Sequence, residues 1–237
     1  MSDQHTDSLA ELTPGHPLVD GPADAEIHLL LAHGAGAGME HEFMQAIAEG
    51  LAAKGIRVIR FEFPYMHRRR LDGQKRPPDR MPKLLDSYQS RFEQQLAQLP
   101  VGSRLFVGGK SMGGRVASML PVQLVEQQPD CATLPAGVIC LGFPFHPPGK
   151  PEKYRGEHLL QIPCPTLIIQ GERDTFGTKQ ELEAYDLGDR VEVSLLHDGD
   201  HSFKPRKASG TTLEHNLEQA IKAMVTFLRH HSQENHP

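Results

Sequence analysis

The sequence has few cysteines and no long hydrophobic run. Its three cysteines, Cys131, Cys140 and Cys164, are an odd number without C-x-x-C spacing, which argues against a disulfide framework and a zinc site. We expect them to be buried thiols. No apolar stretch approaches the roughly 20 residues that cross a bilayer, and the polar N-terminus does not resemble a secretory signal. We therefore expect a cytoplasmic protein without a metal site or a membrane contact.

Two nucleotide-binding fingerprints are also missing. The segment GGKSMGG, residues 108–114, ends like a phosphate-binding loop, but that loop would need a glycine where Arg104 stands. The glycine-rich HGAGAG at 33–38 would need a further glycine at position 39 or 41 to form a dinucleotide-binding turn, and these positions hold Met39 and His41. We therefore expect no cofactor.

The charge is acidic overall and basic in one segment. A net charge of −5 argues against general nucleic-acid binding. Residues 67–83 nevertheless carry seven Lys and Arg against two Asp, a local net charge of +5 that leaves −10 for the remainder. The prolines and the glycine of this basic segment predict that most of it is not helical. It is either a solvated surface or a surface that selects substrates.

Apolar runs alternate with helical patterns along the chain. The runs predict strands at 27–32, 56–63, 104–109, 137–142, 165–171 and 191–196. Helices are expected over 44–52 with a stop at Gly55, over 85–99, after residue 111 with a kink or end near Pro121, and over 178–186. The last helix is expected to open with the capping box Thr211–Glu214 and to bury one side that holds Leu217, Ile221, Met224, Val225 and Leu228.

This alternation predicts an α/β fold with a mostly parallel, twisted sheet of about six to seven strands and helices on both faces. The 237 residues fit one domain, which we place at 27–230. Residues 1–26 are expected to be partly irregular, and 231–237 to form a polar tail.

The pentapeptide Gly109-Lys110-Ser111-Met112-Gly113 fits the pattern G-x-S-x-G and lies between a predicted strand and a predicted helix. A serine on such a sharp turn has its hydroxyl exposed at the edge of the sheet, and glycines two residues away avoid a collision. The pattern alone is weak, and an ordinary strand-to-helix turn remains the alternative. In the functional interpretation, Ser111 is a nucleophile.

An acid and a histidine follow two later strands. In a parallel sheet, functional groups gather at the carboxyl ends of the strands, and here Asp174 follows 165–171 while His201 follows 191–196. Serine, acid and histidine in this chain order match the triad of such folds, in which histidine acts as the base and the acid orients it. The alternatives are Glu172, Asp198 or Asp200 as the acid and His197 as the base. His33 is expected to bond within its own loop, and His146 to lie on the surface.

An attacked carbonyl develops a negative oxygen that needs preorganised N–H donors. The backbone N–H of Met112, directly after the serine, is one candidate. The backbone N–H of Ala35 is the other, since the glycines of its loop allow close approach.

These motifs together resemble the small α/β-hydrolases. The segments that carry the likeness are LLLAHGAGAGMEHEFM, RVIRFEFPYM, KRPPDR, GGKSMGGRVAS, PTLIIQGERDTFG and GDHSF, spread over residues 27–230. More narrowly they are similar to the dienelactone-hydrolase-like branch, which includes the testis-expressed and histone-acetylation-complex-associated hydrolase-like proteins of animals. The resemblance implies Ser111, Asp174 and His201 as the triad, and Ala35 and Met112 as the oxyanion donors. Larger members have additional strands before residue 27, where this chain has room for at most one.

The expected function is that of a serine hydrolase that forms an acyl-enzyme on a small-molecule ester, thioester or lactone. Many relatives insert a helical cap after the strand equivalent to 137–142, whereas this chain has about twenty residues there, so an open site is expected. Perhydrolysis on the same triad remains open, while a serine at the turn argues against dehalogenase or epoxide-hydrolase chemistry.

The basic segment follows a strand end and should lie near Ser111. Its arginines are candidates for binding an anionic group of the substrate: Arg68, Arg69, Arg70, Arg76 and Arg80. The alternative function is a non-catalytic interaction module that docks an acidic partner through this segment. The oligomeric state is not indicated by the sequence.

Overall fold

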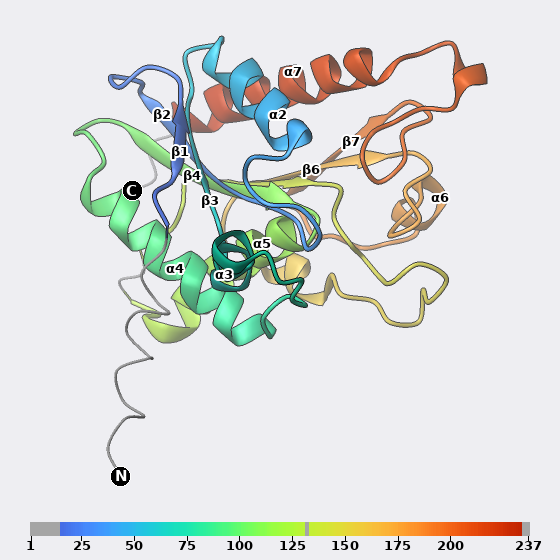
Figure 1. Ribbon diagram of the computed structural model, residues 1–237. Coiled ribbons are helices and arrows are strands. Elements are labelled where there is room, and N and C mark those ends of the chain that lie inside the picture. The colour runs from blue at the N-terminus through green and yellow to red at the C-terminus, as the bar shows by residue number, and fades with distance from the viewer. Residues whose placement is uncertain (1–14, 131–132, 234–237) are drawn as a thin grey trace.

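The computed structural model describes residues 15–130 and 133–233 (Figure 1). The strands are β1 Leu18–Asp20, β2 Ile27–Ala32, β3 Arg57–Phe61, β4 Arg104–Lys110, β5 Val138–Leu141, β6 Thr166–Gly171 and β7 Val191–Leu196. The α-helices are α2 Glu42–Ala52, α3 Pro64–Asp72, α4 Met81–Ala97, α5 Met112–Gln127, α6 Lys179–Leu182 and α7 Leu213–Ser232. Two short 3-10 helices are η1 Glu157–Gln161 and η2 Lys207–Ser209.

The strands form one seven-stranded sheet in the order β1-β3-β2-β4-β5-β6-β7. Only β1 is antiparallel to its neighbour, and it is the single strand that precedes β2 within the described residues. Helices α2 and α7 cover one face of the sheet, and α4 and α5 cover the other (Figure 1). Buried apolar side chains therefore form two clusters, one on each face. The predicted α/β architecture, with its sheet and its two helical layers, is confirmed.

The register brings the carboxyl ends of successive strands together. Strand β2 lies between β3 and β4, so the chain changes direction across the sheet at this point, which is where open α/β sheets place their ligands. Ala32 at the end of β2 pairs with Gly109 in β4, and Gly171 at the end of β6 pairs with Leu196 at the end of β7. The loops that follow these strands consequently lie along one edge of the sheet.

About half of the basic segment is helical, namely 67–72 in α3 and 81–83 in α4, so the expectation of an irregular chain holds only for the connection between them. Pro77 and Pro78 lie in the connection between the two helices, whereas the glycine and the other prolines stand at helix ends. Pro64 is at the start of α3, and Gly73, with φ 72°, ends this helix in the left-handed conformation that favours glycine. Pro82 lies in the first turn of α4. Only residues 73–80 separate the two helices.

Three other helices differ from expectation. Helix α5 continues through Pro121 to Gln127, because a proline removes only one helical hydrogen bond and apolar side chains before and after it are buried against the sheet. The N-cap of α7 is Thr212, whose side chain accepts from the His215 N–H, one residue later than the capping box predicted. Helix α7 also continues to Ser232, which brings the first two residues of the expected tail into the helix. Helix α6 is shorter than predicted.

The two cysteines within the described residues, Cys140 and Cys164, are buried thiols as expected, and burial raises the pKa of Cys164 to about 12. Cys131 falls outside those residues. Among the helices of 15–130 and 133–233, none combines the length and the hydropathy of a membrane-spanning segment.

A buried tyrosine joins α4 to the centre of the sheet. The Tyr88 hydroxyl lies 2.8 Å from the carbonyl oxygens of Leu30 and of Gly108, and it accepts a hydrogen bond from the Gly108 N–H at 2.9 Å. The side chain is fully buried, and desolvation raises the pKa of the hydroxyl well above its usual range. It therefore stays protonated and can donate to one of the two carbonyls while satisfying a backbone N–H of β4.

Replacing Tyr88 with Phe should lower the free energy of unfolding by about 1–3 kcal/mol, because buried backbone groups lose their partner. Urea denaturation measures this change. Tyr185→Phe is the matched control, since the Tyr185 hydroxyl makes no hydrogen bond to any residue that the structure describes. Equal stability losses in the two variants would show that the Tyr88 hydroxyl does not tie the helix to the sheet.

Candidate active site

Ser111 lies on a strained turn between β4 and α5. Its φ of 52° and ψ of −117° are rare for a residue with a side chain. The two flanking glycines are required by close approach: a Cβ at Gly109 would overlap the backbone of Gly113, and a Cβ at Gly113 would overlap the carbonyl oxygen of His33. The strand, the turn and the helix are those that the G-x-S-x-G pattern needs, so this serine is not in an ordinary strand-to-helix turn.

The structure brings Ser111, His201 and Asp174 together in one hydrogen-bonded row. The Nε2 atom of His201 is 2.8 Å from Ser111 Oγ, and its Nδ1 atom is 2.8 Å from Asp174 Oδ2. These residues are 90 and 27 positions apart in the chain. With Nδ1 protonated and donating to the carboxylate, Nε2 can accept the proton of the serine hydroxyl.

Asp174 is completely buried and its carboxylate is fully bonded. Besides His201, the Gln170 amide donates to Oδ2 at 3.0 Å, and the Phe176 N–H donates to Oδ1 at 2.9 Å. Gln170 is itself held by the backbone of Phe143, whose N–H donates to Gln170 Oε1 at 2.7 Å. The role of Gln170 was not predicted from the sequence. The available signal was a lone amide side chain at the end of the otherwise apolar strand 165–171.

The other acidic candidates have different partners. Asp198 forms ion pairs with Arg206 and Arg173, and these pairs, Arg206 first, hold the pKa of Asp198 at about 2. Glu172 accepts from the Asp198 N–H at 2.9 Å. Asp200 accepts from the N–H groups of residues 202 and 204 and so caps its own turn. None of these three carboxylates is hydrogen-bonded to His201.

The remaining histidines are accounted for in the same way. His197 is exposed and lies 3.2 Å from Glu172, away from the serine. His146 was expected on the surface but is buried, with Nε2 3.1 Å from Glu181 and Nδ1 2.9 Å from the Pro147 carbonyl oxygen. Glu181 is 35 positions away in the chain, a contact that a sequence pattern cannot show.

The loop after β2 is fixed by His33 and Tyr65. His33 Nε2 accepts from the Phe63 N–H at 3.1 Å, so Nδ1 carries the proton and donates to the Gly34 carbonyl at 2.7 Å. Burial lowers the pKa of His33 to about 4 and keeps the ring neutral. The Tyr65 hydroxyl lies within 3.2 Å of the carbonyl oxygens of Gly34 and Ala35. The expected structural role of His33 is confirmed.

The two predicted oxyanion donors border the serine. The Met112 N–H is at the first position of α5 and has no acceptor within its helix. A Cβ built on Gly34 would lie 3.7 Å from Ser111 Cβ, so the Ala35 loop is directly adjacent. No backbone hydrogen bond to another described residue involves the N–H of Ala35 or of Met112. Both donors are therefore free for a ligand in the part of the chain that the structure describes.

A cleft of about 340 Å³ opens beside the serine. Its walls include Ala35, Phe43, Met44, Lys110 and Phe176. The connection at 142–165 contains only the short helix η1, so it forms no helical cap, as its length indicated. The Phe176 ring lies against the His201 imidazole, with the ring centroids 4.3 Å apart.

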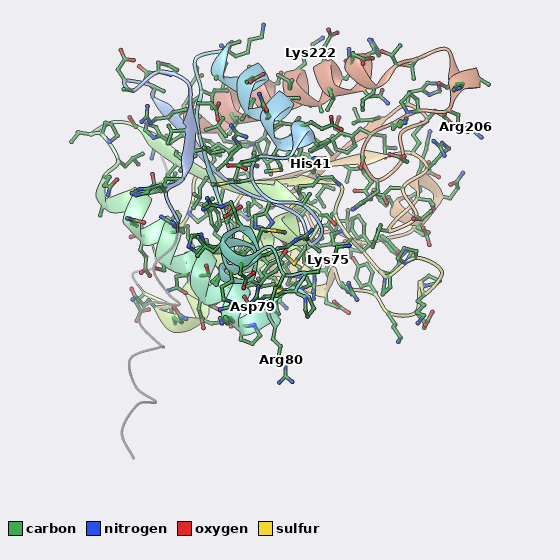
Figure 2. All side chains as sticks on the ribbon, viewed as in Figure 1. His41, Lys75, Asp79, Arg80, Arg206 and Lys222 are labelled. Carbon is green, nitrogen blue, oxygen red and sulfur yellow. The ribbon has the colours of Figure 1, made fainter. Side chains whose placement is uncertain are left out.

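The five arginines of the basic segment do not converge on the cleft. Three are paired with carboxylates: Arg68 with Asp79, Arg70 with Glu62, and Arg76 with Asp72. The Arg80 side chain extends away from the body of the protein (Figure 2).

Arg69 differs from the other four. It donates to the Gly36 carbonyl oxygen at 3.2 Å. With Arg70, which is paired with Glu62, it lines a hollow of about 390 Å³ that shares Gly36, Ala37 and His41 with the cleft. Of these two arginines, Arg69 is the one without a carboxylate partner among the described residues.

The sheet order, the strained serine and the hydrogen-bonded row define an α/β-hydrolase fold. The chain matches the model of the alpha/beta hydrolase domain family over residues 25–229 and belongs to that family.

Solved structures with the same fold include a serine hydrolase without a lid from Xanthomonas campestris, with a TM-score of 0.63 at 20% identity over 90% of this chain and 87% of that one. A dienelactone hydrolase from Anabaena variabilis has a TM-score of 0.64 at 18% identity, covering 89% and 91% of the two chains. A thermophilic esterase from Thermogutta terrifontis has a TM-score of 0.61 at 18% identity, covering 92% and 93%.

The close approach at the turn predicts that Gly109→Ala lowers the free energy of unfolding by about 2–3 kcal/mol, because the new methyl group has only backbone to displace. Thermal and urea unfolding measure the change. Gly36→Ala is the control, since a Cβ there meets no atom within 4 Å; it should change stability by less than about 0.5 kcal/mol. A Gly109 variant as stable as the Gly36 variant would contradict the packing described for the turn.

Proposed function

We propose that this protein is a serine hydrolase that acts on small carboxylic esters, thioesters or lactones through an acyl-enzyme intermediate. The observation that carries the proposal is the row in which Ser111 Oγ, the His201 ring and the Asp174 carboxylate are joined at 2.8 Å. A serine hydroxyl becomes a good nucleophile only when a base takes its proton, and this row supplies the base and the acid that orients it.

In the proposed reaction, Ser111 Oγ attacks the acyl carbon while its proton passes to His201 Nε2. The carbonyl oxygen becomes an oxyanion, which the N–H groups of Ala35 and Met112 stabilise, each by about 3–4 kcal/mol. The tetrahedral intermediate then collapses, and His201 protonates the leaving alcohol, thiol or ring oxygen. A water molecule deprotonated by His201 releases the acid in a second round of the same steps.

The buried Asp174 supports the histidine through both steps. The imidazole becomes positively charged when it holds the serine proton, and a carboxylate that accepts from Nδ1 stabilises this charge. Gln170 and the Phe176 N–H also donate to the carboxylate, so both of its oxygens have hydrogen-bond partners although it is buried. It therefore holds the ring with Nε2 toward the serine.

The cleft supports small substrates. Its volume of about 340 Å³ lies at the lower end of the range for small-molecule sites, about 300–1,000 Å³. The short connection at 142–165 adds no apolar cap that would bury a long acyl chain. A neighbouring fold described as a serine hydrolase without a lid is consistent with this arrangement.

Arg69 is the residue of the basic segment that we propose for an anionic group of the substrate. It is part-buried beside Gly36, and no carboxylate of the described residues pairs with it. The pairing of Arg68, Arg70 and Arg76 leaves much less free positive charge than the sequence suggested, which weakens the interaction-module alternative that the likeness to the animal relatives raised. We therefore favour the enzyme.

A fluorophosphonate should form one covalent adduct with the wild-type protein and none with Ser111→Ala, because only an activated serine reacts at this rate. Intact-protein mass spectrometry measures both. Ser202→Ala, which removes a hydroxyl next to His201 in the chain, is the control and should still be labelled. A folded wild type that forms no adduct would refute the hydrolase proposal and favour the interaction module.

The Arg69→Gln variant should lose about tenfold in kcat/KM for an aryl ester with a carboxylate on its leaving group, the usual effect of one charge-assisted hydrogen bond. Its kcat/KM for the matched neutral ester should change little. Steady-state kinetics on the two esters measure this preference, and Arg80→Gln is the control because that side chain points away from the protein (Figure 2). An unchanged ratio of the two esters in Arg69→Gln would rule out a role for Arg69 in selecting anions.

A further inference from the structure

Lys110, the last residue of β4, is a buried cation beside the candidate active site. It precedes Ser111 in the chain, and the residue is 9% exposed. Its Nζ donates to the main-chain carbonyl oxygen of His201 at 2.6 Å. One side chain therefore connects the strand that carries the nucleophile with the loop that carries the histidine.

The surroundings of the ammonium are apolar. Nζ lies 5.4 Å from the ring centroid of Phe43 and 5.7 Å from that of Phe203, within the distance of a cation–π interaction. A Cβ built on Gly142 would lie 2.7 Å from Nζ, so the absence of a side chain there leaves the space that the ammonium occupies. Within the described residues, no carboxylate is at ion-pair distance from Lys110. In the part of the chain that the structure describes, the hydrogen bond to His201 is thus the one polar contact of the ammonium.

The loop that Lys110 holds is strained. Asp198 and Phe203, on either side of His201, have φ values of 49° and 69°, which residues with side chains seldom adopt. The Asn216 side chain fixes the ends of the loop by donating to the carbonyl oxygens of His197 and Phe203. Between these two points, the Lys110 contact holds the main chain of His201 itself.

We propose that Lys110 is a positioning residue, which holds the His201 main chain above Ser111, and that loss of its proton at alkaline pH weakens this contact and lowers the activity. The proposal rests on the hydrolase function proposed above and concerns how its base is kept in place. A neutral amine keeps a donor but loses the cation–π attraction and the charge-assisted part of the hydrogen bond.

The direction of the pH effect follows from burial. Desolvation lowers the pKa of Lys110 to about 8, and the charges of Asp174 and Asp200 oppose this shift. The lysine is therefore charged at neutral pH and loses its proton as the pH rises through about 8. The other titratable groups that face it are His201 from the loop and His41 from the cleft wall. The Tyr65 hydroxyl contacts the neighbouring loop at Gly34 and Ala35. It remains protonated in this pH range, since burial raises its pKa.

The test compares the pH dependence of kcat in the wild type, Lys110→Met and Lys222→Met. Methionine keeps the apolar stem and removes the donor and the charge, while Lys222 is exposed on α7, away from the site (Figure 2). For a small neutral ester, Lys110→Met should lower kcat by up to about 10²-fold with little change in KM, as expected for a displaced base. The wild type and Lys222→Met should lose activity above pH 8, a decline that Lys110→Met should lack.

A folded Lys110→Met with the wild-type kcat, or with the same alkaline decline, would overturn the proposal. If the Lys110→Met variant does not fold, a wild-type kcat that stays constant from pH 7 to 9.5 would also overturn the proposal. An inactive wild type would refute the hydrolase function instead. The positioning is then still measured by ¹⁵N NMR of the histidine rings, with His201→Gln to assign the signals: shifts of the His201 signals in Lys110→Met support it, and unchanged signals overturn it.

Discussion

The turn at Ser111 is the constraint on which the rest of the site depends. A residue with this backbone conformation costs on the order of 1–3 kcal/mol, so the surrounding structure has to impose it. The Ser111 N–H is bonded to Leu141 in the neighbouring strand at 2.9 Å, and its carbonyl oxygen accepts the first helical bond, from Arg115, at 3.0 Å. Because the strand and the helix both hold Ser111, its hydroxyl points out of the sheet edge. The backbone N–H of the next residue, Met112, is left without an acceptor in its helix.

The parallel sheet supplies the partners of that serine. Loops after β2, β6 and β7 meet at the same edge, and each brings one kind of group: backbone N–H donors, a carboxylate and an imidazole. The buried Asp174 is acceptable in this interior because three donors, from Gln170, Phe176 and His201, satisfy its oxygens. Replacing any one donor would leave part of a buried charge without a partner, so the acid depends on the whole arrangement of strands.

Much of this arrangement could be predicted from the sequence because it depends on local patterns. Strands 27–32 and 191–196 agree with the structure. Ser111, Asp174 and His201 were chosen from their positions after strands, and the structure brings the three side chains together. Gln170 and Lys110 were missed, since their roles come from contacts with residues far away in the chain. His146 was misplaced for the same reason: its ring is buried and contacts Glu181, 35 positions away in the chain, which leaves no periodic signal. The helical parts of the basic segment were not predicted, because proline and glycine can either interrupt a helix or mark its ends. The sequence alone does not distinguish these two cases.

The basic segment shows why a count of charged residues along the chain does not predict the charge that is available at a site. The basic segment carries a net charge of +5, yet Arg70 is bonded to Glu62 outside the segment, and Asp72 and Asp79 pair with arginines within it. Apart from the part-buried Arg69, most of what remains is solvent-exposed and is screened within about 8–10 Å. Lys110 contributes one charge, but it lies in an apolar environment beside the histidine, where an electrostatic interaction is several times stronger than at the surface. In the proposed positioning role, the buried lysine next to the serine therefore acts on the site more strongly than an exposed charge of the basic segment would.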